Sequence, residues 1–210
     1  MLPETDSAHR LDLQAAVDAL VTIEPRFAPV ARRAAPLSIR MRKAGFATLA
    51  DIIVSQQLSV GAADAIAGRL LDQSIVSRQD YLDASDEVLR QCGLSHQKIG
   101  YIRALALGGV DFDALESLPD RSVVEILTGI RGIGPWTAKI YLIFCLGRLD
   151  VIPAGDLAVR EAARDLLQLE DRPTERQLLV IAEAWTPWRT VAACLLWECY
   201  RMKKKRVGIR

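Results

Sequence analysis

A glycine-rich turn between two apolar segments is the first feature of the sequence that could do chemistry. Residues 127–144 read LTGIRGIGPWTAKIYLIF, with Gly132-Ile133-Gly134 at the centre. Such a turn leaves backbone N–H groups uncovered, and a helix beginning at Pro135 would point its N-terminal amides and positive dipole end the same way. These groups can bind an anion such as a DNA phosphate without Lys or Arg. The alternative is a tight corner between two helices, in which glycine only supplies a positive φ.

A single carboxylate follows about twenty residues later. Asp156 comes directly after Pro153-Ala154-Gly155, at the expected start of another helix. An aspartate in this place suits an N-cap, whose carboxylate accepts hydrogen bonds from the first backbone amides of the helix. A carboxylate can also stabilise a developing cation and orient or deprotonate an attacking water. The two roles can coexist in one residue.

Helices must position both features, because apolar residues recur at helical spacing along most of the chain. We find no convincing alternation typical of strands, although LDVIPAG could hold a few extended residues. The sequence therefore predicts an all-α fold of short loops and many helices, forming one domain or a compact pair of lobes. Ser85 and Ser95 are plausible N-caps, and Gly93 is a suitable C-terminal stop. Helices are predicted in the segments 11–23, 46–73 (with a break near Ser59-Val60-Gly61), 85–93, 95–109, 121–130, 135–147, 156–169, 174–185 and 186–204.

Charge and cysteine usage narrow the class of protein. The net charge is only +1, so bulk charge does not indicate a nucleic-acid partner, although residues 26–43 and the tail 201–210 are basic. The polar N-terminus does not resemble a signal peptide, and no apolar run approaches ~20 residues, so we expect a cytoplasmic protein without a membrane span. Two histidines and cysteines without a CxxC pattern indicate reduced, buried thiols and no zinc site. The cysteines are Cys92, Cys145, Cys194 and Cys199.

Four motifs, in order, resemble the helix-hairpin-helix DNA glycosylase superfamily. LTGIRGIGPWTA resembles its hairpin, at about residues 122–144, and VIPAGDLAVREAA resembles the downstream loop that carries an aspartate. IIVSQQLSVGAADAI and AEAWTPWRTVAACLLW resemble segments of the alkylpurine branch, DNA-3-methyladenine glycosylase II. The resemblance extends from Phe46 to Trp197. It implies one glycosylase domain over residues 1–210, two helical lobes with an active-site cleft between them, and a compact form without the N-terminal β domain of larger members.

This resemblance implies a DNA repair enzyme that flips an alkylated purine, of the 3-methyladenine or 7-methylguanine type, out of double-stranded DNA. Asp156 would then assist hydrolysis of the N-glycosidic bond. Relatives that also cut the strand carry a lysine where this chain has Trp136, so we expect a monofunctional enzyme that leaves an abasic site. Two alternatives remain: a glycosylase for another damaged or deaminated base, and a helix-hairpin-helix module that binds DNA without catalysis.

The resemblance also assigns the remaining site residues. Trp136, Trp197 and Tyr141 would form an aromatic pocket for a cationic base; the tyrosine that some relatives carry one turn after the pocket tryptophan is Ile140 here. Trp185 and Trp188 are interpreted as packing residues.

DNA contacts would come from three segments. The hairpin turn and Thr137 would bind phosphate, Gln57 or Leu58 would fill the gap left by the flipped base, and Lys98 could add a phosphate contact. The backbone carbonyls of Thr128, Ile130 and Ile133 would hold a structural Na⁺ or K⁺. We expect no required cofactor, no iron–sulfur cluster and a monomer.

Overall fold

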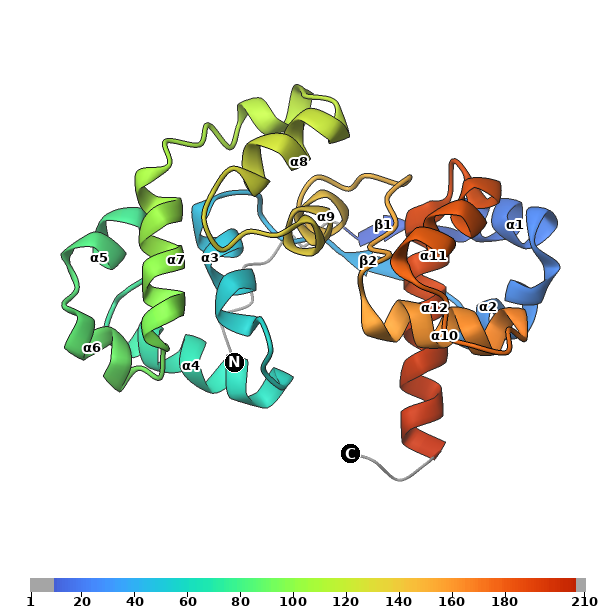
Figure 1. The fold of residues 1–210 in the computed structure, drawn as a ribbon, viewed down its shortest axis with the longest axis horizontal. Coiled ribbons are helices and arrows are strands. Elements are labelled where there is room, and N and C mark those ends of the chain that lie inside the picture. The colour runs from blue at the N-terminus through green and yellow to red at the C-terminus, as the bar shows by residue number, and fades with distance from the viewer. Residues whose placement is uncertain (1–9, 207–210) are drawn as a thin grey trace. The chain divides into compact units, whose positions relative to one another are not determined.

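The computed structural model describes residues 10–206, which are helical along most of their length (Figure 1). The described chain forms two compact units. Unit 1 comprises Arg42–Tyr141, and unit 2 comprises residues 10–41 and 142–206. These observations confirm the predicted all-α, two-lobed fold; the predicted cleft between the lobes stays a prediction. Within residues 10–206, no helix is long and apolar enough to cross a membrane.

Unit 1 is built around helix α7, which packs against α3, α5 and α6. Serine side chains begin four of its helices, each accepting a hydrogen bond from the amide three residues later, which satisfies one otherwise unpaired donor. The predicted caps at Ser85 and Ser95 are confirmed, and Gly93 ends α6 with a φ of 101°. The elements of unit 1 are α3 (Phe46–Ser55), α4 (Val60–Asp72), α5 (Arg78–Asp83), α6 (Asp86–Gln91), α7 (His96–Leu107), η2 (Ala114–Ser117), α8 (Asp120–Thr128) and the start of α9 (Pro135–Phe144).

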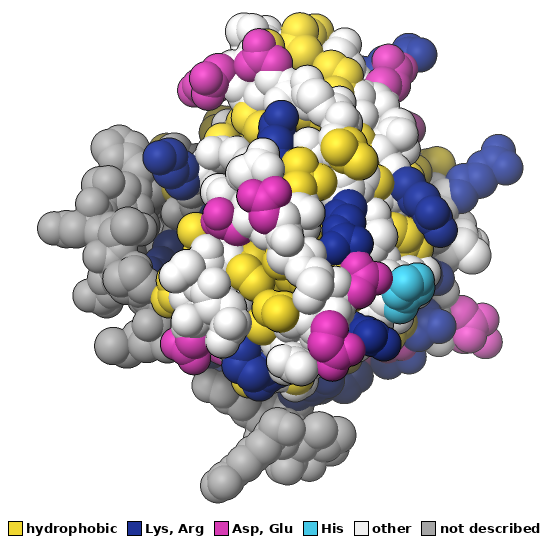
Figure 2. Space-filling view, turned by 90° about the vertical axis from the view of Figure 1, so that its left-hand side faces the viewer, with side chains coloured by type: hydrophobic (Ala, Val, Ile, Leu, Met, Phe, Trp, Pro, Cys, Tyr) yellow, Lys and Arg dark blue, Asp and Glu magenta, His cyan; other side chains and the backbone are white. Residues whose placement is uncertain are grey.

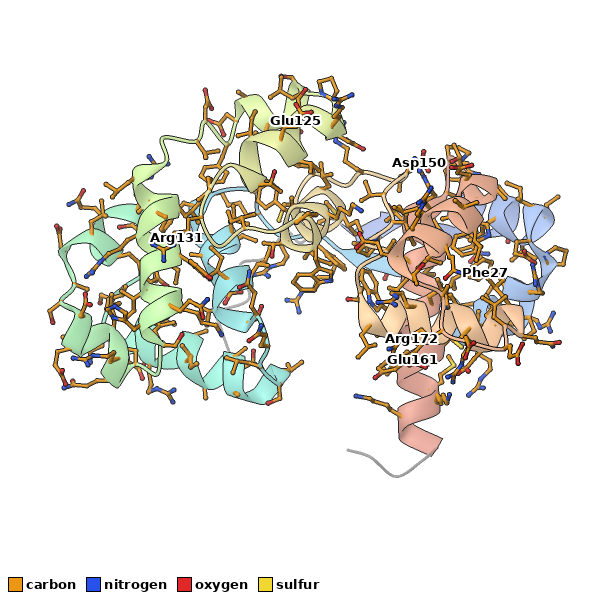
Figure 3. The ribbon with its side chains drawn as sticks, viewed as in Figure 1. Phe27, Glu125, Arg131, Asp150, Glu161 and Arg172 are labelled. Carbon is orange, nitrogen blue, oxygen red and sulfur yellow. The ribbon has the colours of Figure 1, made fainter. Side chains whose placement is uncertain are left out.

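Unit 2 is centred on α12, which packs against α10, α2 and α1. Its core includes Phe27, labelled in Figure 3, whose ring meets Trp185 edge to face at 5.4 Å. Trp185 is fully buried, which confirms its interpretation as a packing residue. The elements of unit 2 are β1 (Arg10–Asp12), α1 (Gln14–Ile23), η1 (Pro25–Phe27), α2 (Ala28–Ala34), β2 (Ser38–Arg40), the end of α9, α10 (Leu157–Leu167), α11 (Glu175–Ala182), η3 (Glu183–Trp185) and α12 (Arg189–Arg206).

A small two-stranded sheet in unit 2 was not predicted. Strands β1 and β2 pair antiparallel, with Leu11 opposite Ile39. Each strand has three residues, which is too short for a period-two pattern to emerge from the sequence. The short helices α2 and α5 were missed for a similar reason, because six or seven residues span barely two turns.

Candidate DNA-binding and catalytic site

The hairpin turn between α8 and α9 contains two glycines with different structural requirements. Gly132 has a φ of 94°, and a Cβ added there would lie 2.1 Å from the ring of Tyr101. The fold therefore requires glycine at this position. Gly134 lacks a positive φ and is exposed, and a Cβ added there would meet no atom within 4 Å. The fold does not require this second glycine, so its bare backbone is open to a partner outside the chain.

Side chains beneath the turn fix its shape. Ile133 is buried, and its amide donates to the Ile130 carbonyl at 3.1 Å. The Gln56 amide nitrogen donates to the Gly132 carbonyl at 3.3 Å and to the Thr137 hydroxyl at 3.0 Å. Because Thr137 is only 2% exposed, its hydroxyl cannot contact DNA. The predicted phosphate contact of Thr137 could therefore be made only by its backbone amide, in the first turn of α9, and this stays a prediction.

The carbonyls predicted to bind a monovalent cation lie at this turn. The Ile130 oxygen already accepts the Ile133 amide, but a carbonyl oxygen has a second lone pair. The donor set is therefore compatible with Na⁺ or K⁺, which favours backbone oxygen ligands, and the site stays a prediction. Among the described residues, no cluster of three or more His, Cys, Asp or Glu side chains could hold a metal ion.

The turn between α3 and α4 carries the two candidates for filling the gap in the DNA. Gln57 is exposed and adopts a left-handed φ of 58°, a conformation that costs a non-glycine residue about 1–2 kcal/mol. Leu58 follows and is 39% exposed, an unusual position for a large apolar side chain. Both side chains are accessible to a partner, and their role stays a prediction.

The Lys98 side chain is bonded to the protein's own backbone. Its ammonium donates to the carbonyls of Val54 and Gln56, at 2.6 and 2.8 Å, and so holds the C-terminal end of α3. Burial lowers the pKa of this ammonium below the ordinary lysine value. Two of its three donors are used inside the protein, and the phosphate contact stays a prediction.

The three candidate pocket aromatics differ in exposure. Trp136, in the first turn of α9, is 36% exposed, so its indole is accessible. Trp197 is partly exposed and packs on Phe144 at 5.8 Å. Tyr141 is fully buried, and its hydroxyl accepts the Gly45 amide at 2.9 Å. A ring without exposed surface cannot stack on a base, so the assignment of Tyr141 to the pocket is wrong.

Asp156 begins α10 in unit 2. Its side chain accepts the Val159 amide at 3.0 Å, and its own amide donates to the Pro153 carbonyl at 2.8 Å. The N-cap role is confirmed, and it fixes the carboxylate at the positive end of the helix dipole, partly exposed. The cap bond gives the carboxylate a fixed direction, and the catalytic role itself stays a prediction.

The loop that leads to Asp156 is held by two residues that sequence reasoning did not assign to the site. Arg189 forms a two-point ion pair with Asp150, at 2.7 and 2.8 Å. The buried Thr190 hydroxyl donates to the Arg148 carbonyl at 2.7 Å and accepts the Val151 amide at 3.0 Å. The signal in the sequence was the TPWRT segment, whose arginine and threonine make these contacts. They restrict the loop and with it the place of the carboxylate.

Surface charge supplies no basic patch over the outer helices of unit 1. Figure 2 shows Lys and Arg interspersed with Asp and Glu on the face that carries α5, α6 and α7. Several arginines in unit 2 form ion pairs, among them Arg172, which lies 2.7 Å from Glu161 and close to it in Figure 3. These paired charges give no sign of a strongly basic patch there, in keeping with contacts made by backbone groups and a few local side chains.

Comparisons with known proteins identify relatives over most of the chain. Residues 50–188 match the family model described as HhH-GPD superfamily base excision DNA repair protein. DNA-3-methyladenine glycosylase 1 of Schizosaccharomyces pombe is 34% identical over 77% of this chain and 75% of its own length. The crystal structure of a DNA-3-methyladenine glycosidase from Bacillus halodurans superposes with a TM-score of 0.80 at 33% identity, over 93% of this chain and 94% of that one. The S. pombe 3-methyladenine DNA glycosylase in complex with abasic DNA gives 0.74 at 32% identity, over 88% and 94%.

Proposed function

The chain belongs to the HhH-GPD superfamily of base excision DNA repair proteins, and we propose that it removes alkylated purines of the 3-methyladenine or 7-methylguanine type from double-stranded DNA. The reaction is hydrolysis of the N-glycosidic bond, and the product is an abasic site. The observation that carries this proposal is the fixed, partly exposed Asp156 carboxylate in a chain whose relatives are named for this activity.

The chemistry starts from the charge of the damaged base. Alkylation at N3 or N7 makes a purine cationic, so the bond to the sugar breaks with its electron pair moving onto the base. A cationic flat ring stacks favourably on an electron-rich indole, and Trp136 offers an exposed one. Since the base is already a good leaving group, the protein does not need an acid to protonate it.

Asp156 acts on the sugar. As the bond breaks, positive charge develops on the sugar ring, and a carboxylate beside it lowers the energy of the transition state. The same carboxylate orients the water that adds to the anomeric carbon and accepts its proton. The cap bond to Val159 holds the side chain in place, so little reorganisation is needed during the reaction.

The hairpin and the wedge candidates bring the nucleotide out of the duplex. Gly134 lets a phosphate approach the first amides of α9, and Leu58 or Gln57 occupies the space left in the base stack. This arrangement uses few charged side chains, in keeping with a net charge of +1.

The enzyme is proposed to be monofunctional. Trp136 occupies the place at which strand-cutting relatives carry a nucleophilic lysine, so this chain lacks an amine at that position. A monomeric state and a cytoplasmic location stay predictions.

The test is a single-turnover assay on a duplex that carries one 7-methylguanine or 3-methyladenine, quenched with and without hot alkali. We expect release of the free base, strand breaks only after alkali, and no enzyme–DNA cross-link after borohydride. Tight binding to this duplex without base release would contradict the proposed activity, and a borohydride cross-link would contradict the monofunctional mechanism.

A further inference from the structure

Two exposed turns of unit 1 are joined by a single side chain. Residues 56–59 form the wedge turn, and residues 131–134 form the hairpin turn. Gln56 begins the wedge turn, and its amide nitrogen donates to Gly132 in the hairpin turn and to Thr137 just after it, at 3.3 and 3.0 Å. Both N–H groups of the amide are used, so this side chain has a fixed direction.

Helix α7 supports both turns from behind. The Lys98 ammonium donates to the Gln56 carbonyl at 2.8 Å and to the Val54 carbonyl at 2.6 Å. Tyr101 lies three residues later on the same face of α7, and its ring lies so close to Gly132 that no Cβ would fit. One helix face therefore contacts the start of the wedge turn and the middle of the hairpin turn.

These contacts are more than ordinary core packing. Both hydrogen-bond partners of the Gln56 amide lie about 80 residues further along the chain. The next residue, Gln57, is held in a left-handed conformation. Lys98 is kept partly out of water to bond two carbonyls at the end of α3, which costs free energy. A glycine after the last turn is the commoner way to end a helix.

We propose that Gln56 and Lys98 form a brace that fixes the distance between the wedge turn and the hairpin turn, so that the wedge enters the base stack while the hairpin holds the backbone. The two residues are positioning residues and do not touch the reacting atoms. This inference rests on the proposed function, because it assumes that both turns contact the same DNA.

The consequence is a defect specific to stacked substrates. Without the brace, the hairpin still binds phosphate, but the wedge is misplaced, and a misplacement of about 1 Å can lower a rate by about a hundredfold. A substrate whose target base is already unstacked needs no wedge and should react normally.

The test uses Gln56→Met, which keeps the length of the side chain and removes both donors. The matched control is Gln91→Met, the same change at an exposed glutamine of α6 that bonds only to Glu87 within its own helix. Lys98→Met is a second variant, useful if Gln56→Met unfolds, and thermal melts show that each variant tested is folded.

Wedge insertion is measured apart from chemistry. A duplex carries 2-aminopurine beside a stable abasic analogue, and its fluorescence rises when the neighbouring stack opens. We expect wild type and Gln91→Met to raise the signal, and Gln56→Met and Lys98→Met to lose most of the rise at enzyme concentrations that saturate the duplex. With an alkylated base, base release should fall by about tenfold or more on the duplex and by less than about twofold on single-stranded DNA.

Each outcome decides the inference. An equal fluorescence rise in wild type and both brace variants overturns it, as does no rise with wild type, since the wedge itself would then be absent. An equal loss of base release on duplex and single strand also overturns it, because this pattern marks a general structural role. Loss of the fluorescence rise in the brace variants alone supports the brace even if wild type releases no alkylated base, an outcome that would contradict only the proposed lesion.

Discussion

Alanine at the two hairpin glycines should separate stability from DNA binding. Gly134→Ala places a methyl group in open space at an ordinary φ, so it should stabilise the fold through the unfolded state by about 0.4–1 kcal/mol. For a chain of this length the melting temperature should rise by about 1–4 °C. The same methyl group blocks the approach of a phosphate to the backbone. Loss of one hydrogen bond to a charged group costs about 1.5–3 kcal/mol, so the Kd should rise by about ten- to a hundredfold.

Gly132→Ala should behave in the opposite way. An alanine at a φ of 94° costs about 1–2 kcal/mol, and the clash with Tyr101 adds an overpacking cost of about 1–3 kcal/mol. We therefore expect a loss of about 2–5 kcal/mol in the free energy of unfolding. Gly68→Ala, inside α4 with no atom within 4 Å of the new Cβ, is the matched control and should change stability without changing binding.

The assay is fluorescence anisotropy at one fixed salt concentration, with a duplex that carries an abasic analogue, together with a thermal melt of each variant. The reasoning is refuted if Gly134→Ala binds as tightly as Gly68→Ala. It is also refuted if Gly134→Ala destabilises the protein as much as Gly132→Ala, because the turn would then be only a tight corner between helices.

Four further predictions follow from the described residues. Trp136→Ala should lower base release in the single-turnover assay while leaving the melting temperature within about 3 °C, because the indole is exposed. A Trp136→Ala variant that releases base at the wild-type rate would show that Trp136 is not part of the base pocket. Asp150→Ala should lower the free energy of unfolding, measured by urea titration, by about 1–2 kcal/mol, because it leaves Arg189 without this partner; an unchanged midpoint would contradict this. Burial raises the pKa of Cys194 to about 12, so its thiol should resist iodoacetamide at pH 8 in the native protein, as judged by mass spectrometry. Because the unfolded thiol ionises first, this group should also make stability fall as pH rises from about 9 towards 12, a slope that Cys194→Ala should reduce.

Local features of the fold were predictable because they depend on neighbours in the sequence. Ser85 and Ser95 were identified as caps from their place before apolar helical repeats, and the break between α3 and α4 was placed near Ser59. Asp156 was likewise identified as a cap, since its role depends only on the three residues that follow it.

Contacts between distant segments were not predictable. The bond from Gln56 to Thr137 joins residues 81 apart, and no local pattern distinguishes this hydroxyl from an exposed one. Lys98 was missed as a helix-end contact for the same reason, because its carbonyl partners lie more than 40 residues away.

The error at Tyr141 has a geometric cause. Five residues along a helix correspond to a rotation of about 140° from Trp136, so an exposed tryptophan directs this tyrosine inward. Tyr141 is fully buried as a result, and its hydroxyl is used to hold Gly45. The resemblance supplied the residue type but not the face of the helix.

The central claim is that the Asp156 carboxylate drives base release. Asp156→Asn removes the charge but keeps an oxygen that can cap α10, so the melting temperature should stay within about 2 °C of wild type. Asp171→Asn, at an exposed aspartate in the same unit, is the matched control. The direct measurement is the single-turnover rate of 7-methylguanine release from a duplex at saturating enzyme. We predict that Asp156→Asn binds the duplex normally and releases base at least a hundredfold more slowly, while Asp171→Asn matches wild type. Release by Asp156→Asn at the wild-type rate would contradict the account.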